Sequence, residues 1–413
     1  MTRLERFVRA VQFASRSGTL RAQVRSRVQQ QAARLRYLVQ DPAASEGIAL
    51  HCPDYVEPSQ DPAERGLVER IIRSFTRMKA DQRDAPTCYH PSSLWQRQLD
   101  ESYASLAAGD PRTVHAFLAN FGTWKTYHGL EPTTLLRAHR RSLTGRRYLA
   151  DVLFRRPLQF WKAFFNGRRP LARLTYPRHG NQAGAFIGPL FVGAGSFSND
   201  IYGSLLNGLI RDRARPVVAE LGAGYGKLAY FTLRDLEAFT YIDVDLPETV
   251  CLAAYYLMKA WPEKRALLYG EAPYTPEAHS RYDLIFLPSY AIERAAPASV
   301  DLFINKDSLG EMTREAVTRY VGAMTRAARY FFHINHDRDL PLLAPHEQGL
   351  LASDYPVPEA FRLLFRAPDM SHSISNGGAD IRLDRFVYLY ERKGSAEAGT
   401  AAEPLFAQEA GAP

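Results

Sequence analysis

One turn in the middle of the chain constrains the fold more than any other feature of the sequence. Residues 217–226 read Val-Val-Ala-Glu-Leu-Gly-Ala-Gly-Tyr-Gly, an apolar run that ends in an acid and continues with a glycine at every second position. Such a run is typical of a buried strand in a parallel sheet. Glycines directly after the strand let the backbone approach a nucleotide-like ligand, so the turn predicts an α/β protein with a crevice for an adenosine-bearing cofactor.

Single residues distinguish three nucleotide-binding motifs that begin in this way. The dinucleotide fingerprint has its third glycine where this chain has Lys227. The Walker phosphate loop needs glycine at the position of Leu221 and Ser or Thr at that of Leu228. The pattern that remains, Glu-x-Gly-x-Gly-x-Gly over 220–226, resembles the first motif of the class I S-adenosylmethionine-dependent methyltransferases.

This resemblance implies a Rossmann-like α/β sheet, mostly parallel with its last strand antiparallel, and S-adenosylmethionine (SAM) as the cofactor. Glu220, at the carboxyl end of the strand, is then expected to meet the cationic methionine part of SAM. The backbone of Gly222, Gly224, Tyr225 and Gly226 is expected to lie against the cofactor, since glycine has no Cβ to block the approach.

Two aspartates follow at the end of the second predicted strand, 239–244. Asp243 and Asp245 lie 17 and 19 residues after Gly226, about where a carboxylate of a Rossmann-like unit binds both ribose hydroxyls. Asp245 fits the methyltransferase pattern Val-Asp-Leu-x-Pro-Glu better, and we predict that it contacts the ribose. For Asp243 two interpretations stay open, a structural role or a place beside the methionine part.

The segment after the third predicted strand, 282–287, departs from the class I pattern. In that family a Gly-Asp pair follows this strand and its acid binds the adenine amino group, whereas this chain has Pro288-Ser289-Tyr290. We therefore expect Ser289 to contact adenine through its hydroxyl or N–H, and Tyr290 to stack on the ring. Asn305, which ends the fourth predicted strand (300–305), is also among the predicted cofactor contacts.

Several motifs narrow the resemblance. The chain from about residue 180 to residue 393 is similar to the sugar O-methyltransferase family, which implies methyl transfer to a sugar or glycan hydroxyl. The motifs are Leu287-Pro288-Ser289, Val300-Asp301-Leu302-Phe303-Ile304-Asn305 with Ser308 and Glu311-Met312, Tyr330-Phe331-Phe332-His333-Ile334-Asn335-His336-Asp337, and Tyr388-Leu389-Tyr390-Glu391-Arg392-Lys393.

Transfer to a sugar needs a group that takes the hydroxyl proton as the new bond forms, since a neutral hydroxyl is a poor nucleophile. The strand ends offer five candidates: His333, His336, Asp337, Asp307 and Glu311. His336 lies past the end of the fifth predicted strand (329–334), next to Asp337, and is the predicted base. His333 lies between two apolar residues, so its alternative interpretation is a core histidine.

The same strand ends suit a hard cation. Asp307, Glu311, His336 and Asp337 offer side chains that could assemble around Mg²⁺, and the ion would orient neighbouring sugar hydroxyls. Nothing in their spacing requires a metal, so no metal ligand is assigned.

The net charge of +8 belongs to the first forty residues, which hold nine arginines and one acid, Glu5. The other residues carry 43 basic and 43 acidic side chains, a balance that argues against a nucleic-acid groove along the catalytic part. For the basic segment several interpretations stay open: peripheral contact with an anionic membrane, contact with a nucleic acid, an organellar presequence, or a solvated arm.

Cysteine usage and hydropathy bound the compartment. Cys52, Cys88 and Cys251 are too few and too scattered for a disulfide framework or a metal cluster, which favours the reducing cytoplasm. No apolar run approaches the roughly 18 residues that a membrane-spanning helix needs.

Composition and capping signals divide the chain. Residues 41–60 are polar and contain proline, which predicts a linker. Asp61 as the cap, Pro62 in the first turn and Glu64 in a capping box then predict the start of a helical domain that covers the acceptor site. The predicted divisions are a basic N-terminal arm and linker (1–60), the helical domain (61–175), the methyltransferase domain (176–393) and a disordered tail (394–413).

Other functions compatible with the same motifs stay open. A methyltransferase of this class with another small molecule or RNA as its acceptor would carry the same glycine turn. A SAM-binding protein without turnover, acting as a partner in glycan assembly, is a further alternative, although the intact Glu220, glycines and Asp245 weigh against it.

Overall fold

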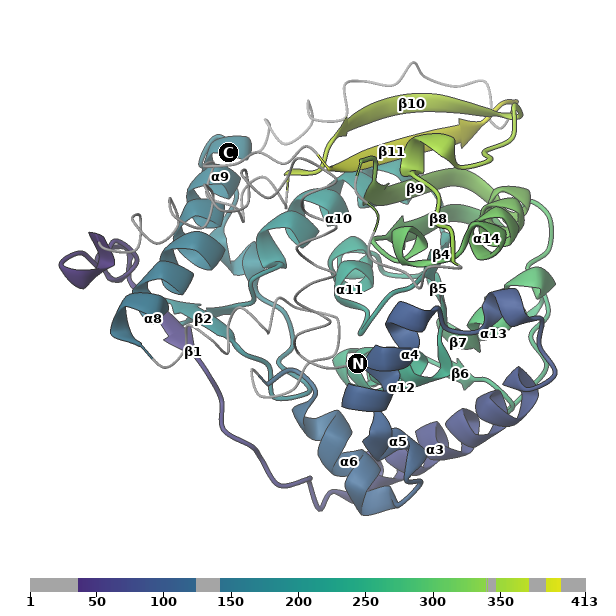
Figure 1. Cartoon of the computed structure of the whole chain (residues 1–413), viewed down its shortest axis with the longest axis horizontal. Helices are drawn as coiled ribbons and strands as arrows, with labels where there is room; N and C mark the ends of the chain where they lie inside the picture. The colour runs from purple at the N-terminus through teal and green to yellow at the C-terminus, as the bar shows by residue number, and fades with distance from the viewer. Residues whose placement is uncertain (1–35, 124–141, 339, 341–346, 371–383, 395–413) are drawn as a thin grey trace.

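A central eight-stranded sheet organises the molecule (Figure 1). The computed structural model describes residues 36–123, 142–338, 340, 347–370 and 384–394. The strands lie in the order β10-β11-β9-β8-β4-β5-β7-β6. Their bounds are β4 (Val217–Leu221), β5 (Thr240–Asp245), β6 (Ala266–Leu268), β7 (Leu284–Pro288), β8 (Val300–Lys306), β9 (Ala328–His336), β10 (Phe361–Pro368) and β11 (Arg385–Arg392).

The sheet has the predicted Rossmann-like arrangement. Strands β4 to β9 run parallel to their neighbours, β11 is antiparallel to β9, and β10 is antiparallel to β11. Strand β4 has β5 on one side and β8 on the other, so the strand order reverses there. In open parallel sheets, ligands bind beyond the carboxyl ends of the strands at this reversal.

Helices and short helical turns connect the strands of this sheet. Helix α10 precedes β4, and α11 begins directly after the glycine turn. Their bounds are α10 (Ser196–Ile210), α11 (Lys227–Leu233), α12 (Pro247–Ala260), α13 (Ala278–Arg281), α14 (Arg314–Ala327), and the 3₁₀ turns η6 (Ser289–Arg294), η7 (Leu309–Glu311) and η8 (Ala352–Asp354).

Apolar runs located most of the strands, with shifts of a few residues at their ends. Two strands of this sheet, β6 and β10, were not predicted. Strand β6 has only three residues, and β10 leaves most of its side chains half or fully exposed, so neither presents a buried apolar run. The pairing of β10 with β11 also contains a bulge between Leu363 and Phe365.

The helix predicted at Asp61 is α3 (Pro62–Gln82), and the Asp61 carboxylate accepts the Ala63 N–H at 3.0 Å. The predicted capping box is wrong, because Glu64 does not turn back toward Asp61. Its carboxylate crosses to other helices and accepts hydrogen bonds from Tyr255, Lys259 and His115.

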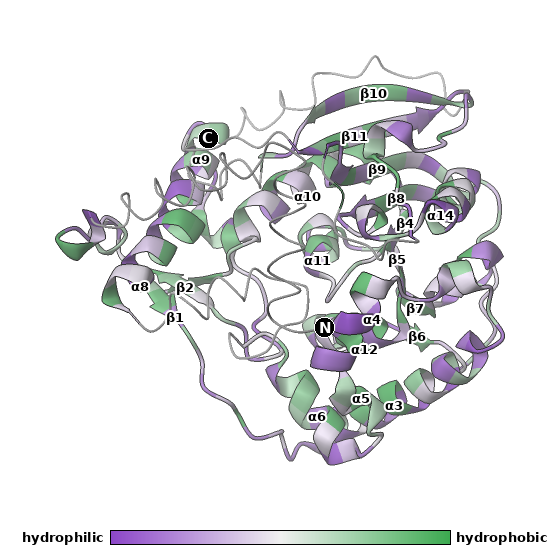
Figure 2. Cartoon of the chain, in the orientation of Figure 1, coloured by the Kyte–Doolittle hydropathy of each residue, from purple (hydrophilic) through white to green (hydrophobic). Residues whose placement is uncertain are grey.

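Helices α3 to α6 pack against the sheet and its helices rather than around a core of their own. Figure 2 shows α3 with an apolar and a polar side, and its apolar side chains Val68 and Ile71 are buried. These side chains belong to one continuous apolar cluster with α12 and the strands. The remaining bounds are the turn η3 (Thr87–Tyr89), α4 (Ser93–Ser102), α5 (Ala104–Ala107) and α6 (Pro111–Asn120).

A second apolar cluster lies beside α10. Strand β1 (Ile48–His51), within the predicted linker, pairs antiparallel with β2 (Gly184–Ile187), and β2 pairs with β3 (Leu190–Val192). Four residues were too short a pattern to reveal β1. The cluster is completed by α8 (Leu143–Ala150), a π-helical turn (Asp151–Arg155) and α9 (Arg156–Phe164); short turns lie at Arg36–Leu38, Ala44–Glu46 and Leu171–Leu174. The predicted domain boundaries remain predictions.

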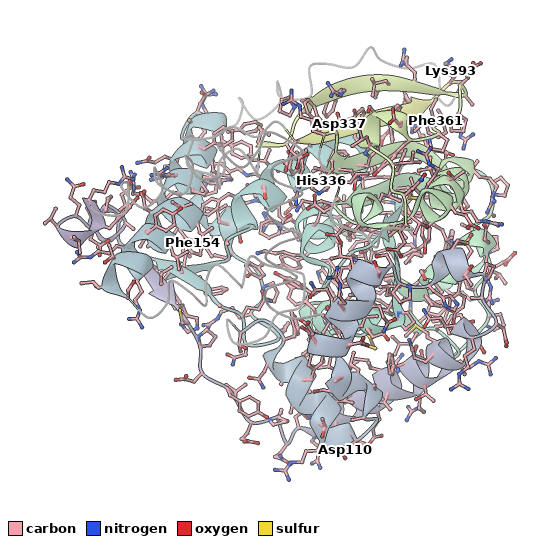
Figure 3. All side chains as sticks on the ribbon, in the orientation of Figure 1. Asp110, Phe154, His336, Asp337, Phe361 and Lys393 are labelled. Carbon is pink, nitrogen blue, oxygen red and sulfur yellow. The ribbon has the colours of Figure 1, made fainter. Side chains whose placement is uncertain are left out.

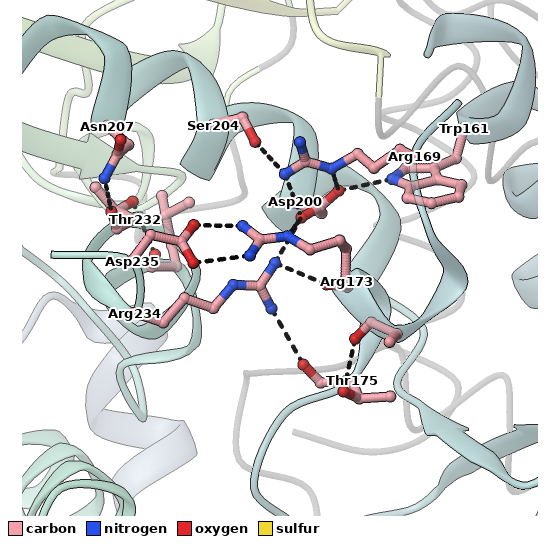
Figure 4. A network of polar contacts seen from close by, with 12 residues as sticks. Trp161, Arg169, Arg173, Thr175, Asp200, Ser204, Asn207, Thr232, Arg234 and Asp235 are labelled. Atoms are coloured by element: carbon pink, nitrogen blue, oxygen red, sulfur yellow. Dashed lines mark hydrogen bonds and ion pairs between the residues drawn. The ribbon is translucent and has the colours of Figure 1, made fainter. Parts of the chain in front are cut away.

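A buried ionic network fixes the helices that flank the glycine turn (Figure 4). Asp200 on α10 is 1% exposed and accepts hydrogen bonds from Trp161 Nε1 (2.8 Å), Arg169 Nε (2.7 Å) and an Arg234 amino group (2.6 Å). A buried carboxylate is costly without such partners. The network therefore holds α9, α10 and the end of α11 in one arrangement.

Candidate functional site

A cavity of about 410 Å³ lies over the carboxyl ends of β4, β5 and β8. Its volume is within the range of roughly 300 to 1,000 Å³ typical of small-molecule sites. The walls come from the glycine turn and the strand ends, from the start of α10, and from the segment 87–95 of the helical part. The titratable, aromatic and polar side chains that line it include Cys88, His90, Ser92, Trp95, Glu220, Tyr225, Lys227, Asp245, Lys306, Asp307, Ser308, Glu311, Tyr320 and Glu347.

The glycine turn forms one wall of the cavity. Gly222, Gly224 and Gly226 have φ angles of 77°, 63° and 85°, the left-handed region that favours glycine. A Cβ on Gly222 would lie 2.3 Å from the Ser308 hydroxyl oxygen, and one on Gly226 would lie 2.7 Å from the Leu257 side chain. Gly222 and Gly224 therefore line the cavity with backbone alone. Gly226, also predicted to contact the cofactor, does not line the cavity, and the space that its Cβ would need is filled by the buried side chain of Leu257.

Asp245 lies at the rim of the cavity, at the end of β5. Its carboxylate accepts the N–H groups of Gly224 (3.2 Å) and Leu246 (2.7 Å). Burial raises the pKa of Asp245 to about 6, although hydrogen bonds from Thr249 and these two N–H groups oppose the rise. The side chain is thus tied to the glycine turn and still borders the cavity, as a ribose-binding carboxylate must.

Glu220 is the acid that ends β4, and it lines the cavity floor. Tyr241 donates its hydroxyl hydrogen to the Glu220 carboxylate at 2.9 Å. Burial raises the pKa of Glu220 to about 7, opposed by that hydrogen bond and by the charge of Lys306. A cationic ligand in the cavity would favour the ionised form of this carboxyl group.

Asp243 does not line the cavity. It is fully buried, and neither carboxylate oxygen has a hydrogen-bond partner among the described residues. Burial, and then the charges of Asp245 and Glu220, raise its pKa strongly, which favours the neutral acid. Of the two interpretations of Asp243, the place beside the methionine part is not supported by this position.

The remaining predicted cofactor contacts differ in their positions. Tyr225 lines the cavity, and its hydroxyl donates to Gln182 at 3.1 Å. Asn305 lies beneath the turn instead, where its amide donates to the Leu221 carbonyl at 2.9 Å and its oxygen accepts from Asn335 at 2.8 Å. It holds β8 against β4 and β9, so it shapes the turn rather than facing the cavity.

Ser289 and Tyr290, expected beside adenine, do not line the cavity. The Ser289 hydroxyl donates to the Tyr89 carbonyl (3.0 Å), and the Tyr290 hydroxyl donates to the Met78 carbonyl (2.9 Å). Both side chains instead attach the helical segment to the end of β7. Tyr320, on α14, is the aromatic residue that lines the cavity in this region.

Glu311 is the predicted base candidate that the structure brings most directly into the cavity. Its carboxylate accepts the indole N–H of Trp95 at 2.7 Å. Burial raises the pKa of Glu311 despite this hydrogen bond, so its carboxyl group holds a proton more tightly than an exposed glutamate. A carboxyl group whose pKa is raised above its ordinary value is a stronger base when ionised than an exposed glutamate, which suits it to accept a proton.

Asp307 also lines the cavity, directly after β8. Its φ of 69° is in the left-handed region, and its N–H donates to the Ile334 carbonyl at 2.8 Å. Its carboxylate pairs with Arg385 (3.0 Å) and approaches Lys306 (3.7 Å). Because two cations face it, Asp307 is better suited to hold this corner than to accept a proton.

The predicted base His336 and its neighbour Asp337 do not line the cavity. They lie at the end of β9 beside β11 (Figure 3). His336 Nδ1 is 2.9 Å from the Asp384 carboxylate, whereas Asp337 accepts hydrogen bonds from Tyr388 (2.7 Å) and from Arg366. Position past the strand end was the reason for choosing His336, but its ring faces the antiparallel strand.

His333 lies on the same strand and is completely buried. Its ring stacks on Tyr388 with centroids 4.7 Å apart and also contacts Phe331, Tyr355 and Tyr390. Burial lowers its pKa to about 3. His333 is therefore a neutral core residue, which was its alternative interpretation.

Sequence reasoning missed the contribution of the helical segment. Trp95, Ser92 and Glu347 line the cavity together with Glu311. Trp95 and Glu311 are 216 residues apart in the chain. No local pattern marks such a contact.

Within the part of the chain that the structure describes, no group of three or more His, Cys, Asp or Glu side chains is arranged to hold a metal ion. The four residues considered for Mg²⁺ separate, with Asp307 and Glu311 at the cavity and His336 and Asp337 beside β11. No helix of the described ranges has the length and apolarity to cross a membrane.

The residues present fit SAM. Backbone at positive φ gives room for an adenosine-bearing ligand, Asp245 is placed for a ribose, and the buried Glu220 is placed for a cation. Glu311, from the turn after β8, and Trp95, from α4, line the same cavity.

No protein-family model and no curated protein matches the chain. Similar solved structures include the mitomycin 7-O-methyltransferase MmcR (14% identity, TM-score 0.30), where the match covers 48% of this chain and 55% of that enzyme. The match to magnesium protoporphyrin IX methyltransferase (ChlM) from Synechocystis PCC 6803 with bound SAH covers 48% of this chain and 84% of that enzyme, with 13% identity and a TM-score of 0.30. The match to the small RNA methyltransferase HEN1 covers 50% of this chain and 27% of that enzyme, with 14% identity and a TM-score of 0.33. Identities and TM-scores as low as these say nothing about the reaction of this chain. The fold is assigned from the strand order of its own sheet.

Proposed function

We propose that this chain is a SAM-dependent methyltransferase and that its acceptor is the hydroxyl group of a sugar or glycan. One observation carries the proposal: a single cavity is lined by the glycine turn, Asp245, Glu220 and a half-buried carboxyl group, Glu311. The similarity of residues 287–393 to the sugar O-methyltransferase motifs supports the acceptor class. The methyltransferases among the similar structures act on acceptors as different as mitomycin and RNA, so they do not select one.

The residues divide the work of the transfer. Bound SAM supplies a methyl group already activated by the sulfonium charge. Asp245 binds the ribose hydroxyls, and Glu220 binds the cationic methionine part. Glu311 accepts the proton of the acceptor hydroxyl as the O–C bond forms and the methyl–sulfur bond breaks, which would leave the cofactor as its neutral thioether. Glu311 takes this role from His336, which lies outside the cavity. The cavity holds the acceptor oxygen close to the activated methyl group, which favours transfer.

The cofactor part of the proposal is tested by calorimetric titration of the purified protein with SAM. We expect binding by the wild type and a loss of at least about tenfold in affinity for Asp245→Asn, since an amide cannot accept both ribose hydroxyl hydrogen bonds. Asp301→Asn is a matched control, because Asp301 does not line the cavity. Absence of SAM binding would exclude both the methyltransferase and a cofactor-binding partner.

The acceptor part needs a separate experiment. The protein is incubated with methyl-labelled SAM and with panels of free sugars, nucleotide-linked sugars, glycans and RNA, and the label in each product is counted. We expect label in a sugar-containing acceptor and none with Glu311→Gln. Label in RNA alone would assign the other acceptor class, and SAM binding without transfer to any panel would favour a non-catalytic role.

A further inference from the structure

A hydrogen bond connects the helical segment to the carboxyl group at the acceptor side of the cavity. The Trp95 indole N–H, on α4, donates to the Glu311 carboxylate, in the turn after β8, over 2.7 Å. Both side chains line the cavity. Since the two residues are far apart in the chain, the hydrogen bond exists only when the helical segment is seated on the sheet.

The start of α4 is itself held in place, so the indole has a defined position. The Ser92 hydroxyl caps the helix by accepting the Trp95 N–H at 3.4 Å. On the other side, the Glu347 carboxylate accepts the Ser93 N–H at 3.0 Å and also the Ser93 hydroxyl hydrogen. An acid at the N-terminus of a helix is favourably placed for these contacts.

We propose that Trp95 is a positioning residue for the transfer: its indole N–H orients the Glu311 carboxylate and holds it ready to accept the proton of the acceptor hydroxyl. This inference rests on the proposed function, because it assigns a partner to the group that acts as base there. The Trp95 indole is a hydrogen-bond donor without an acceptor atom. It can therefore bond to a Glu311 oxygen that accepts, but not to one that donates a hydrogen.

The charges around Glu311 fix the direction of the effect. Burial raises its pKa, the Trp95 hydrogen bond lowers it, the charge of Asp307 raises it, and the charges of Arg385 and His336 lower it. Removing the indole N–H leaves the other influences in place. The pKa of Glu311 therefore rises further, and on the acid side of its titration a larger fraction of the molecules holds the protonated, inactive acid.

The test uses Trp95→Phe, which keeps an aromatic ring and removes the donor. In the dependence of kcat/KM on pH, we expect the acid limb to move up by about one pH unit, the shift that corresponds to losing one hydrogen bond to a charged group. On the acid limb, kcat/KM of Trp95→Phe is expected to be about tenfold lower than that of the wild type, and at alkaline pH the two values are expected to be equal. SAM affinity stays unchanged. Trp261→Phe is the matched control, since Trp261 stacks on Tyr230 outside the cavity.

A second measurement does not depend on turnover. Infrared titration follows the carboxyl C=O band that is absent in Glu311→Gln, in the wild type and in Trp95→Phe. We expect this band to persist to a higher pH in Trp95→Phe. If the band titrates at the same pH in both proteins, or if the activity loss is the same at every pH, Trp95 has only a packing role. A shifted band without any methyl transfer would mean that Trp95 does set the pKa of Glu311 but that the proposed function is wrong.

Discussion

Glu220 gives the site a property that can be measured without knowing the acceptor. Burial raises its pKa to about 7, and a cationic ligand binds only to the ionised carboxylate. We therefore expect SAM affinity to rise about tenfold between roughly pH 6 and pH 8, as the ionised fraction rises through the pKa. Calorimetry at a series of pH values measures this dependence.

The control for this prediction is Glu220→Gln, which keeps the size of the side chain and removes its titration. Its SAM affinity is expected to be lower and to show a weaker dependence on pH. An equally steep dependence in the variant would mean that another group, such as Asp245, is responsible.

Gly222 makes a steric prediction at the same scale. Gly222→Ala places a Cβ 2.3 Å from the Ser308 hydroxyl oxygen in a backbone with φ of 77°. We expect the free energy of unfolding to fall by about 2 kcal/mol, measured by urea denaturation, with a loss of SAM binding. Gly208→Ala is the control: its Cβ meets no atom, and alanine favours the helix α10. Equal stability of both variants would contradict the geometry.

Residues differed in how well the sequence indicated their roles. Gly222, Gly224 and Asp245 line one cavity, as expected from their spacing within one local unit of a strand, a turn and a second strand, and their contact with SAM stays a prediction. His336 was misplaced because the chain gives its position along β9 but not the direction of its ring, which the antiparallel strand β11 determines. Trp95 was missed because its partner is remote in the chain.

At the scale of elements, Glu64 connects α3 to α6 and α12. Burial alone would raise the pKa of Glu64, but hydrogen bonds from Lys259, Tyr255 and His115 outweigh burial and lower it to about 2. A lowered pKa stabilises the fold above the ordinary glutamate pKa, and this stabilisation is lost as the pH falls toward about 2. We therefore expect acid to weaken the contact that Glu64 makes between α3 and the helices α6 and α12.

Glu64→Gln tests this connection. At neutral pH we expect it to lower the free energy of unfolding by about 2 kcal/mol, after allowing for screening by solvent. The difference from the wild type should disappear near pH 2, as followed by denaturant unfolding at several pH values. Glu69→Gln, on the exposed side of α3 and 4.0 Å from Arg73, should change stability by less than about 0.5 kcal/mol. A difference that stays constant with pH would exclude the ionic explanation.

Elements with a complete local signal were predicted well. The start of α3 follows from Asp61 and Pro62, and the parallel strands follow from their apolar runs. Strands β1, β6 and β10 were not predicted because their pairing partners, rather than their own patterns, stabilise them. The same limit applies to Glu64. Its distance from Asp61 in the sequence fits a capping box, but in the structure its carboxylate bonds to Tyr255 on α12 instead.

At the scale of the whole molecule, the shared core determines how the chain unfolds. Buried side chains of α3 and α6 belong to the same apolar cluster as the strands of the sheet. We expect the intact chain to unfold in one cooperative calorimetric transition. A fragment of residues 176–394 should show no cooperative transition, because it exposes the apolar surface that α3 to α6 cover. Two transitions, or a stable fragment, would instead support the predicted separate helical domain.

The outer strand β10 has a consequence for the behaviour of the protein at high concentration. An open sheet edge offers unpaired N–H and C=O groups on which another molecule can add a strand. Here the bulge between Leu363 and Phe365 interrupts the regular spacing of those groups. Arg362 and Arg366 on the same strand pair with Glu391 and Asp337, so their charges are largely compensated. Among the described residues, the irregular backbone is thus the feature that opposes pairing, and we expect β10 to be a poor template for a strand from a second copy.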